Sequence, residues 1–197
     1  MFALVDKSDN SITKMLNGNK GITIGDNQYP RAIFTLWTEA ERNAINIYTV
    51  TIDESKRKDE KWYTNTDITY SFDGTNATGS YGDATAKAHA DTLFTAQDET
   101  DGKGTEGEVA VEGLKTILIR NIKSQAETEL SRTDWYITRK SEKNTAIPSA
   151  ITTHRDAVRS KQDSMCTAIT NASDTPALET LYTYTEQEDG SVTRPLG

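Results

Sequence analysis

The sequence predicts an α+β protein: a small β-rich N-terminal part with one short helix, a linker, and a C-terminal helical unit of two long helices plus a short one. Three observations predict this. Short apolar segments separated by turn residues fill the first half, "QDETDGKGTEG" is acidic and Gly-rich, and apolar residues then recur at helical spacing. The expected parts are a β-rich domain at 1–96, an acidic Gly-rich linker at 97–110, a helical domain at 111–184 and an extended tail at 185–197.

The N-terminal part shows the pattern of short strands with one helix between them. Asn17-Gly18 and Asp73-Gly74 are turn signals at the ends of apolar segments. Thr38 precedes Glu41 by three residues, which is the spacing of a capping box, so we expect a helix of about two turns from residue 39. Residues 83–96 form a weak helical pattern. The segments expected to be strands are 2–5, 12–16, 21–30, 46–53, 61–74 and 77–81.

The C-terminal part predicts three helices. The first runs from about 111 to 130, and its apolar face follows the i, i+3, i+4 spacing. The second begins after Pro148 with Ser149 as its N-cap. The third is short, with Asp174 or Thr175 as its cap and Pro176 in its first turn. The apolar face of the first helix comprises Leu114, Ile117, Leu118, Ile122, Ala126 and Leu130.

The segment between the two long helices carries an unusual cluster, "TDWYITRK". We expect a break after residue 130 and a packing corner in which Trp135 fills the angle between the helices and is buried. Arg139 can lie over its ring as a cation–π partner. Pro148 disfavours helix at the residue before it, so the chain should cross to the second helix in extended form. Trp135, Arg139 and Pro148 are therefore expected to be structural anchors.

Charge and composition exclude several classes of protein. The net charge is -8, and an acidic chain repels phosphate backbones, so we expect no nucleic-acid partner. The segment from Arg132 to Lys161 is locally basic, with seven basic and three acidic residues, which indicates a solvated helix face or an anion site. No apolar run approaches membrane-spanning length, so we expect no membrane insertion. The N-terminus has no pattern of a signal peptide, and the single Cys166 cannot form an intrachain disulfide.

The sequence offers little for catalysis, so we expect no enzyme, no cofactor and no metal. His89 and His154 lie in no zinc-binding pattern, and Cys166 falls about 18 Å from His154 on one predicted helix. No Gly-rich phosphate loop is present. The stretch 97–108 has only part of a calcium-loop pattern, and a solvated linker explains it better.

Two aromatic residues allow a different interpretation. Trp62 and Tyr63 could lie on the surface and bind sugars, or they could supply the core of the β-rich part, which has few other large apolar residues. Burial of these rings would exclude the first interpretation.

The corner segment also carries a resemblance. "TDWYITRKSEKNTAIPSAITTHRDAVRS" resembles a segment of tailed-bacteriophage tail-fibre and tail-fibre-assembly proteins. In that pattern T-D-W-x-x-x-R is followed by a spacer, Ile or Val before Pro, and a helix with R-x-A-(V/L)-R. "TIGDNQYPRAIFTLWTEAERNAINIYTV" and "SDTPALETLY" are similar to other parts of these proteins. The corner positions that match are Thr133, Asp134, Trp135, Arg139, Ile147, Pro148, Arg155, Ala157, Val158 and Arg159.

The resemblance implies a non-enzymatic phage tail protein, made in the host cytoplasm and located in the virion tail. We expect a tail-fibre- or baseplate-associated adaptor that contacts other tail proteins and its own copies, with its β-rich part docking on one partner. One alternative is a transient tail-fibre assembly chaperone that leaves before the virion is complete. Another is a host-glycan-binding module that uses Trp62 and Tyr63. The middle of the chain, residues 51–110, carries no resemblance.

Overall fold

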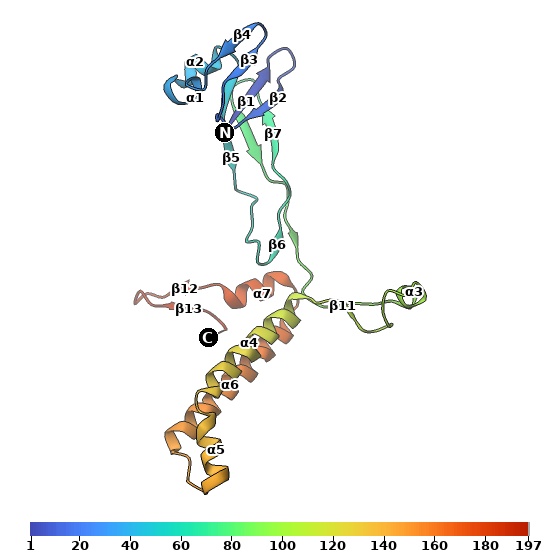
Figure 1. Cartoon of the computed structure of the whole chain (residues 1–197), viewed down its shortest axis with the longest axis vertical. Helices are drawn as coiled ribbons and strands as arrows, with labels where there is room; N and C mark the ends of the chain where they lie inside the picture. Colours follow the sequence, from blue (N-terminus) through green and yellow to red (C-terminus); the bar gives the residue numbers. More distant parts are fainter. Residues whose placement is uncertain (197) are drawn as a thin grey trace. The chain divides into compact units, whose positions relative to one another are not determined.

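The computed structural model of the chain describes residues 1–196 and has the expected α+β fold, with strands concentrated near the N-terminus and long helices near the C-terminus (Figure 1). It divides into two compact units, the first covering Met1–Thr85 and the second beginning at Ala86. The division precedes the expected linker. The reason is that the segment after Ala86 bonds to the first long helix: the N–H of Leu114 donates to the carbonyl of Ala88 over 3.0 Å.

A five-stranded sheet forms the centre of the first unit, in the order β2-β1-β5-β8-β7. β5 and β8 are parallel, and the other pairs are antiparallel. A hairpin of β3 and β4 and two short helices accompany it. The elements of this part of the chain are β1 (Phe2–Asp6), β2 (Ser11–Leu16), β3 (Ile22–Ile24), β4 (Asn27–Tyr29), α1 (Ile33–Leu36), α2 (Glu39–Asn43), β5 (Ile47–Asp53), β6 (Tyr63–Thr64), β7 (Thr69–Phe72), β8 (Ala77–Ser80) and β9 (Thr85–Ala86).

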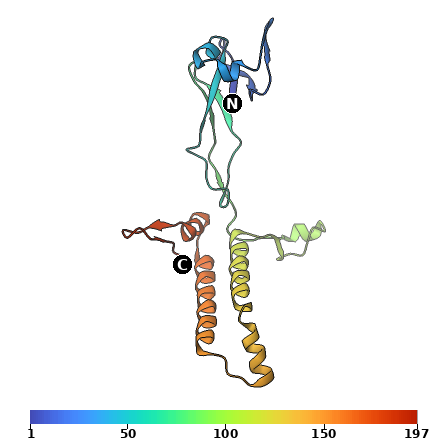
Figure 2. The ribbon, with the colours of Figure 1, turned by 60° about the vertical axis from the view of Figure 1, so that its left-hand side comes forward.

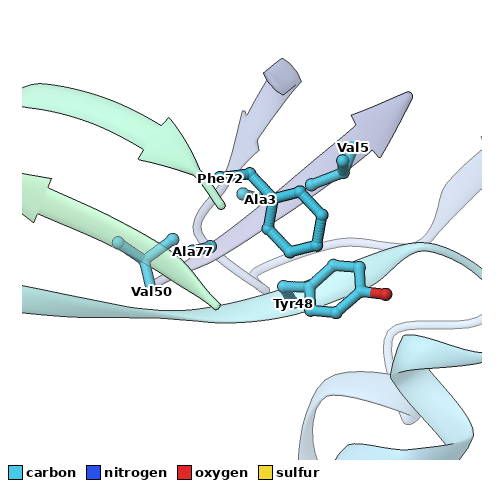
Figure 3. Close-up of a cluster of buried hydrophobic side chains, with 6 residues drawn as sticks. All are labelled: Ala3, Val5, Tyr48, Val50, Phe72 and Ala77. Atoms are coloured by element: carbon cyan, nitrogen blue, oxygen red, sulfur yellow. The ribbon is translucent and has the colours of Figure 1, made fainter. Parts of the chain in front are cut away.

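Side chains from both faces of the sheet are buried, as alternation along a strand requires. On one face Tyr48 packs against Phe72 with ring centroids 4.4 Å apart (Figure 3). On the other face α1 contributes Ile33 and Phe34, which pack against Ile47. The first cluster comprises Ala3, Val5, Tyr48, Val50, Phe72 and Ala77.

The capping box predicted at Thr38 is present. The Thr38 hydroxyl accepts from the N–H of Glu41, and the Glu41 carboxylate accepts from the N–H of Thr38 over 2.7 Å. The Thr38 hydroxyl also donates to this carboxylate over 2.8 Å, and the two bonds to the carboxylate lower the pKa of Glu41, that from the backbone N–H first. The helix that follows, α2, ends at Asn43. Three residues later Asn46, with φ of 60°, turns the chain into β5.

Two long helices, α4 and α6, lie side by side in the second unit (Figure 2). Figure 1 also shows a two-stranded ribbon that carries α3. The elements are β10 (Thr92–Leu93), α3 (Ala96–Thr100), β11 (Val109–Val111), α4 (Leu114–Ser131), α5 (Asp134–Lys143), α6 (Ser149–Asn171), α7 (Thr175–Tyr182), β12 (Thr185–Glu186) and β13 (Val192–Thr193). No helix within the described residues is both long and apolar enough to cross a membrane.

Several local expectations need correction. Residues 83–96 form β9 and β10 rather than a helix, and Thr95 instead caps α3 inside the expected linker. Residues 185–193 form the hairpin β12–β13 rather than an extended tail. In α6 the N-cap is Pro148, and Ser149 is the first helical residue. The strands β9 and β10 pair with β6 and β11, which lie far along the chain, and the apolar pattern of a single segment does not predict such pairing.

Candidate functional site

The corner between α4 and α5 is held by Arg155, which projects from α6 and is only 8% exposed. Its Nη1 donates to the carbonyl of Leu130 over 2.8 Å, at the last turn of α4. The same nitrogen donates to the hydroxyl of Thr133 over 2.6 Å and to the carboxylate of Asp134 over 2.9 Å. A buried guanidinium thus joins the last turn of α4 to the start of α5, where the Leu130 carbonyl also accepts from the N–H and the hydroxyl of Thr133.

Trp135 lies outside this corner rather than within it, and 54% of it is exposed. The predicted burial of Trp135 is therefore wrong. The reason is that the chain resumes a helix at Asp134 and turns the indole outward, while Arg155 occupies the inner angle. The helix α5 itself was not predicted, because the expected corner was an extended crossing.

Trp135, Tyr136 and Arg139 form an aromatic–cation group, which we call the platform. The Trp135 and Tyr136 rings stack with centroids 4.9 Å apart and an interplanar angle of 2°. The Arg139 guanidinium carbon lies 4.5 Å from the Trp135 centroid and 5.4 Å from that of Tyr136. An exposed tryptophan held flat by an arginine is a preorganised binding surface, because little conformational freedom remains to be lost on contact.

Pro148 lies directly before α6 as its N-cap. Its carbonyl accepts from the N–H groups of Ile151 and Thr152, which opens the helix. The preceding helix ends at Lys143, and its C-cap, Asn144, adopts a left-handed conformation with φ of 51°. A short loop without regular secondary structure then connects α5 to α6.

Residues 132–143, which we call the tip, carry four basic and two acidic side chains. Arg132 pairs with Glu129 over 2.8 Å, and the same glutamate lies 3.2 Å from His154. Lys140 and Lys143 are exposed in the last turn of α5. The platform therefore lies within a locally basic surface.

The ribbon of β10 and β11 and the loop between them, residues 92–111, form a second feature, which we call the arm. Asp91 fixes its root to the start of α4: the carboxylate accepts from the N–H of Gly113 over 2.7 Å and from the hydroxyl of Thr116 over 2.8 Å. These bonds, that from Gly113 first, lower the pKa of Asp91. An added Cβ on Gly113 would lie 2.3 Å from backbone atoms of Ala90, so a side chain there does not fit.

The arm exposes apolar side chains beside acidic ones. Leu93 and Val109 are opposite each other in the ribbon and are 49% and 47% exposed, and Val111 is exposed as well. Residues 96–108 carry five acidic side chains and one basic one. Lys103 pairs with Asp98 and Asp101 over 3.2 and 3.0 Å, so Asp101, one of the carboxylates of the calcium-loop pattern, binds a lysine.

Trp62 and Tyr63 do not form a surface. They are 3% and 5% exposed, and the expectation that they could be surface aromatics is corrected by this burial. Lys61 lies 4.4 Å from the Trp62 ring centroid, and Lys58 lies 4.4 Å from that of Tyr63. The N–H groups of both aromatics donate to the carbonyl of Asp59, which turns the rings inward.

Other chemical candidates remain separate. Within residues 1–196 no three His, Cys, Asp or Glu side chains gather as metal ligands. His154 pairs with Glu129, and Cys166 is half-buried three turns further along the same helix. A hollow of about 570 Å³ beside β2 contains Lys14 and Lys20 with apolar neighbours, and it presents no paired acid and base.

Two important residues were missed by sequence reasoning. Arg155 had a signal, because it stands in the apolar stripe of α6 between Ile151 and Val158, where a buried charge needs partners. The sequence contains no signal for Asp91, because its hydrogen-bond partners follow more than twenty residues later and its own segment has no periodicity.

The chain matches no protein-family model, no curated protein and no solved structure.

Proposed function

We propose that this protein is a non-enzymatic structural subunit of a phage tail, an adaptor associated with the tail fibre or baseplate. The observation that carries the proposal is the placement of exposed apolar side chains on protruding elements. Leu93 and Val109 on the arm and Trp135 on α5 are about half exposed. Tyr184 and Val192, in and beside the C-terminal hairpin, are 60% and 62% exposed. Apolar groups presented on narrow elements are typical of parts that are covered on assembly.

The composition of the helical pair supports the same proposal. Along α4 the buried side chains are Leu118, Ile122 and Ala126, and along α6 they are Arg155 and Ile169. Two helices joined by so few buried groups have a small core, and such a pair gains stability when further surfaces pack on it.

The assignment to a phage tail is supported by the resemblance at the corner. Residues that carry this resemblance contact one another in two places: Thr133 and Asp134 bind Arg155, and Trp135 lies under Arg139. A motif whose members contact one another has a physical reason to exist as a unit. The burial of Trp62 and Tyr63 removes the observation on which the glycan-binding alternative depended.

Quantitative mass spectrometry of purified phage particles tests the proposal. We expect this chain in a fixed whole-number ratio to a tail subunit of known copy number, and the ratio should persist through density-gradient purification. Absence from particles, with the chain bound to fibre protein in infected-cell lysate, would overturn the proposal in favour of a transient assembly chaperone.

A further inference from the structure

We propose that the arm of one copy docks on the tip of a second copy, so that subunits associate head to tail. The inference deepens the proposed function by naming one partner of the assembly, and it rests on that function only in taking the chain to be an assembly subunit. Its basis is that the two surfaces are complementary in charge and in apolar character.

The charges of the two surfaces are opposite. Residues 96–108 of the arm hold five acidic side chains and one basic one, for a net charge of -4. The tip, residues 132–143, holds four basic and two acidic side chains, for a net charge of +2. Glu106 and Glu108 are exposed on the arm, and Lys140 and Lys143 are exposed on the tip. Complementary potentials of this kind favour encounter and fix the orientation of the partners.

Each surface also presents apolar groups. On the arm the cross-strand pair Leu93 and Val109 is about half exposed. On the tip Trp135 is 54% exposed and Ile137 is 43% exposed. A two-stranded ribbon is marginally stable alone and gains stability when an apolar surface covers it. Trp135, stacked on Tyr136 and held by Arg139, is a rigid surface of the type that anchors protein interfaces.

The contact cannot form readily within one chain. The apolar pair lies at the root of the arm, next to Gly113 and the first residue of α4. The platform follows the last residue of α4, which has 18 residues and is therefore about 27 Å long. Because Asp91 fixes the root at one end of this helix, the tip that covers the arm belongs to another copy. A contact between two different surfaces either closes reciprocally in a two-fold dimer or propagates into a ring or a filament.

Charge reversal with rescue tests the contact in the full-length protein, with sedimentation velocity as the readout. We expect wild-type protein to associate at concentrations up to about 1 mM, where even weak specific contacts form. Glu106→Lys with Glu108→Lys should lower the association constant at least about tenfold, as should Lys140→Glu with Lys143→Glu. The four substitutions combined should restore association, and raised salt should weaken it in the wild type.

Two further samples sharpen the result. Glu186→Lys with Glu188→Lys makes the same change in net charge on exposed residues near the C-terminal hairpin, and it should leave association unchanged. An equimolar mixture of the arm variant and the tip variant should associate although each variant alone does not, because the reversed arm complements the reversed tip and the two unchanged surfaces complement each other. Trp135→Ala should also weaken association, both in the wild type and in the control with Glu186→Lys and Glu188→Lys, because the arm is intact in each.

Several outcomes would overturn the inference: a wild-type protein that stays monomeric at about 1 mM, reversal variants that associate like the wild type, or a combined variant that fails to recover although circular dichroism shows it folded.

The proposed function fails separately. Particles that contain the chain, with no effect of the arm and tip variants, would leave the tail subunit standing and remove only this contact. If the chain is absent from particles but its arm and tip still associate, the proposed function fails and the arm–tip contact stands.

Discussion

At the scale of single residues, Arg155 determines the geometry of the second unit. One nitrogen of its guanidinium bonds to the end of α4, to the hydroxyl of Thr133 and to the start of α5 at Asp134. A lysine has a single ammonium and no planar fork, and an apolar residue has no donor at all. The orientation of α5, and with it the exposure of Trp135, therefore depends on a residue of a different helix, α6.

Arg155→Met should destabilise the protein by about 2 kcal/mol or more, because it removes the charge-assisted hydrogen bonds that join α6 to Leu130, Thr133 and Asp134. The matched control is Arg159→Met, one turn further along α6, where the arginine is half exposed and pairs only with Asp156. That change should cost less than about 0.5 kcal/mol. Chemical denaturation followed by circular dichroism measures both, and equal effects of the two substitutions would contradict the role of Arg155.

Gly113→Ala should also destabilise the second unit, by about 1–3 kcal/mol, because the new Cβ would overlap backbone atoms that cannot move independently. Backbone atoms of Ala90 lie 2.3 Å from the position of that Cβ. The substitution should separate Asp91 from the start of α4 and loosen the root of the arm. Amide hydrogen exchange at Leu114 and Lys115, whose N–H groups bond to the carbonyls of residues 88 and 89, measures this loosening. Unchanged exchange would show that the close approach is not needed.

At the scale of elements, the arm is shaped by short-range polar bonds. Thr95 and Asp98 form a capping box at the start of α3, and Lys103 lies 3.2 Å from the same aspartate. The backbone N–H of Thr95, its hydroxyl and Lys103, in that order, lower the pKa of Asp98 from 3.8 to about 2. A five-residue helix thus depends on a charged carboxylate.

This dependence predicts how the arm responds to acid. Because the pKa of Asp98 is lower in the folded arm than in an unfolded chain, its stabilising effect is complete above about pH 5 and is lost as the pH falls from about 4 through 2. The ¹³C shift of the Asp98 carboxyl should titrate near pH 2. Thr95→Val and Lys103→Gln should each move the pKa of Asp98 toward 3.8. A midpoint near 4 in the wild type would mean that the capping box does not form in solution.

Sequence reasoning worked best for elements with periodic apolar faces or side-chain caps. The helices α4 and α6 and the capping box at Thr38 follow from spacing alone. The arm did not, because its strands have two and three residues and its bonds to α4 join residues far apart in the chain. At the candidate site Arg139 was identified as a partner of Trp135, whereas the exposure of that tryptophan depends on Arg155, whose contacts come from a different helix.

At the scale of the whole molecule, the proposed role and the physical features agree on where contacts should form. In the first unit Tyr48 and Phe72 pack in the core and Trp62 and Tyr63 are buried, while Leu36 on α1 is 79% exposed. The second unit presents Trp135 on α5 and apolar residues on the arm. For the proposed assembly subunit we therefore expect contacts through the exposed apolar side chain of the first unit as well as through the arm and the tip of the second.

The measurement that tests this account most directly is zero-length carboxyl–amine crosslinking of purified phage particles, followed by mass spectrometry. The account predicts peptides of this chain in the particle, with crosslinks that join Lys140 or Lys143 to Glu106 or Glu108 of another copy, distinguished from links within one chain by mixed isotope labelling. Particles that contain no peptide of the chain, or that contain it with both the arm and the tip free of any crosslink, would contradict the account.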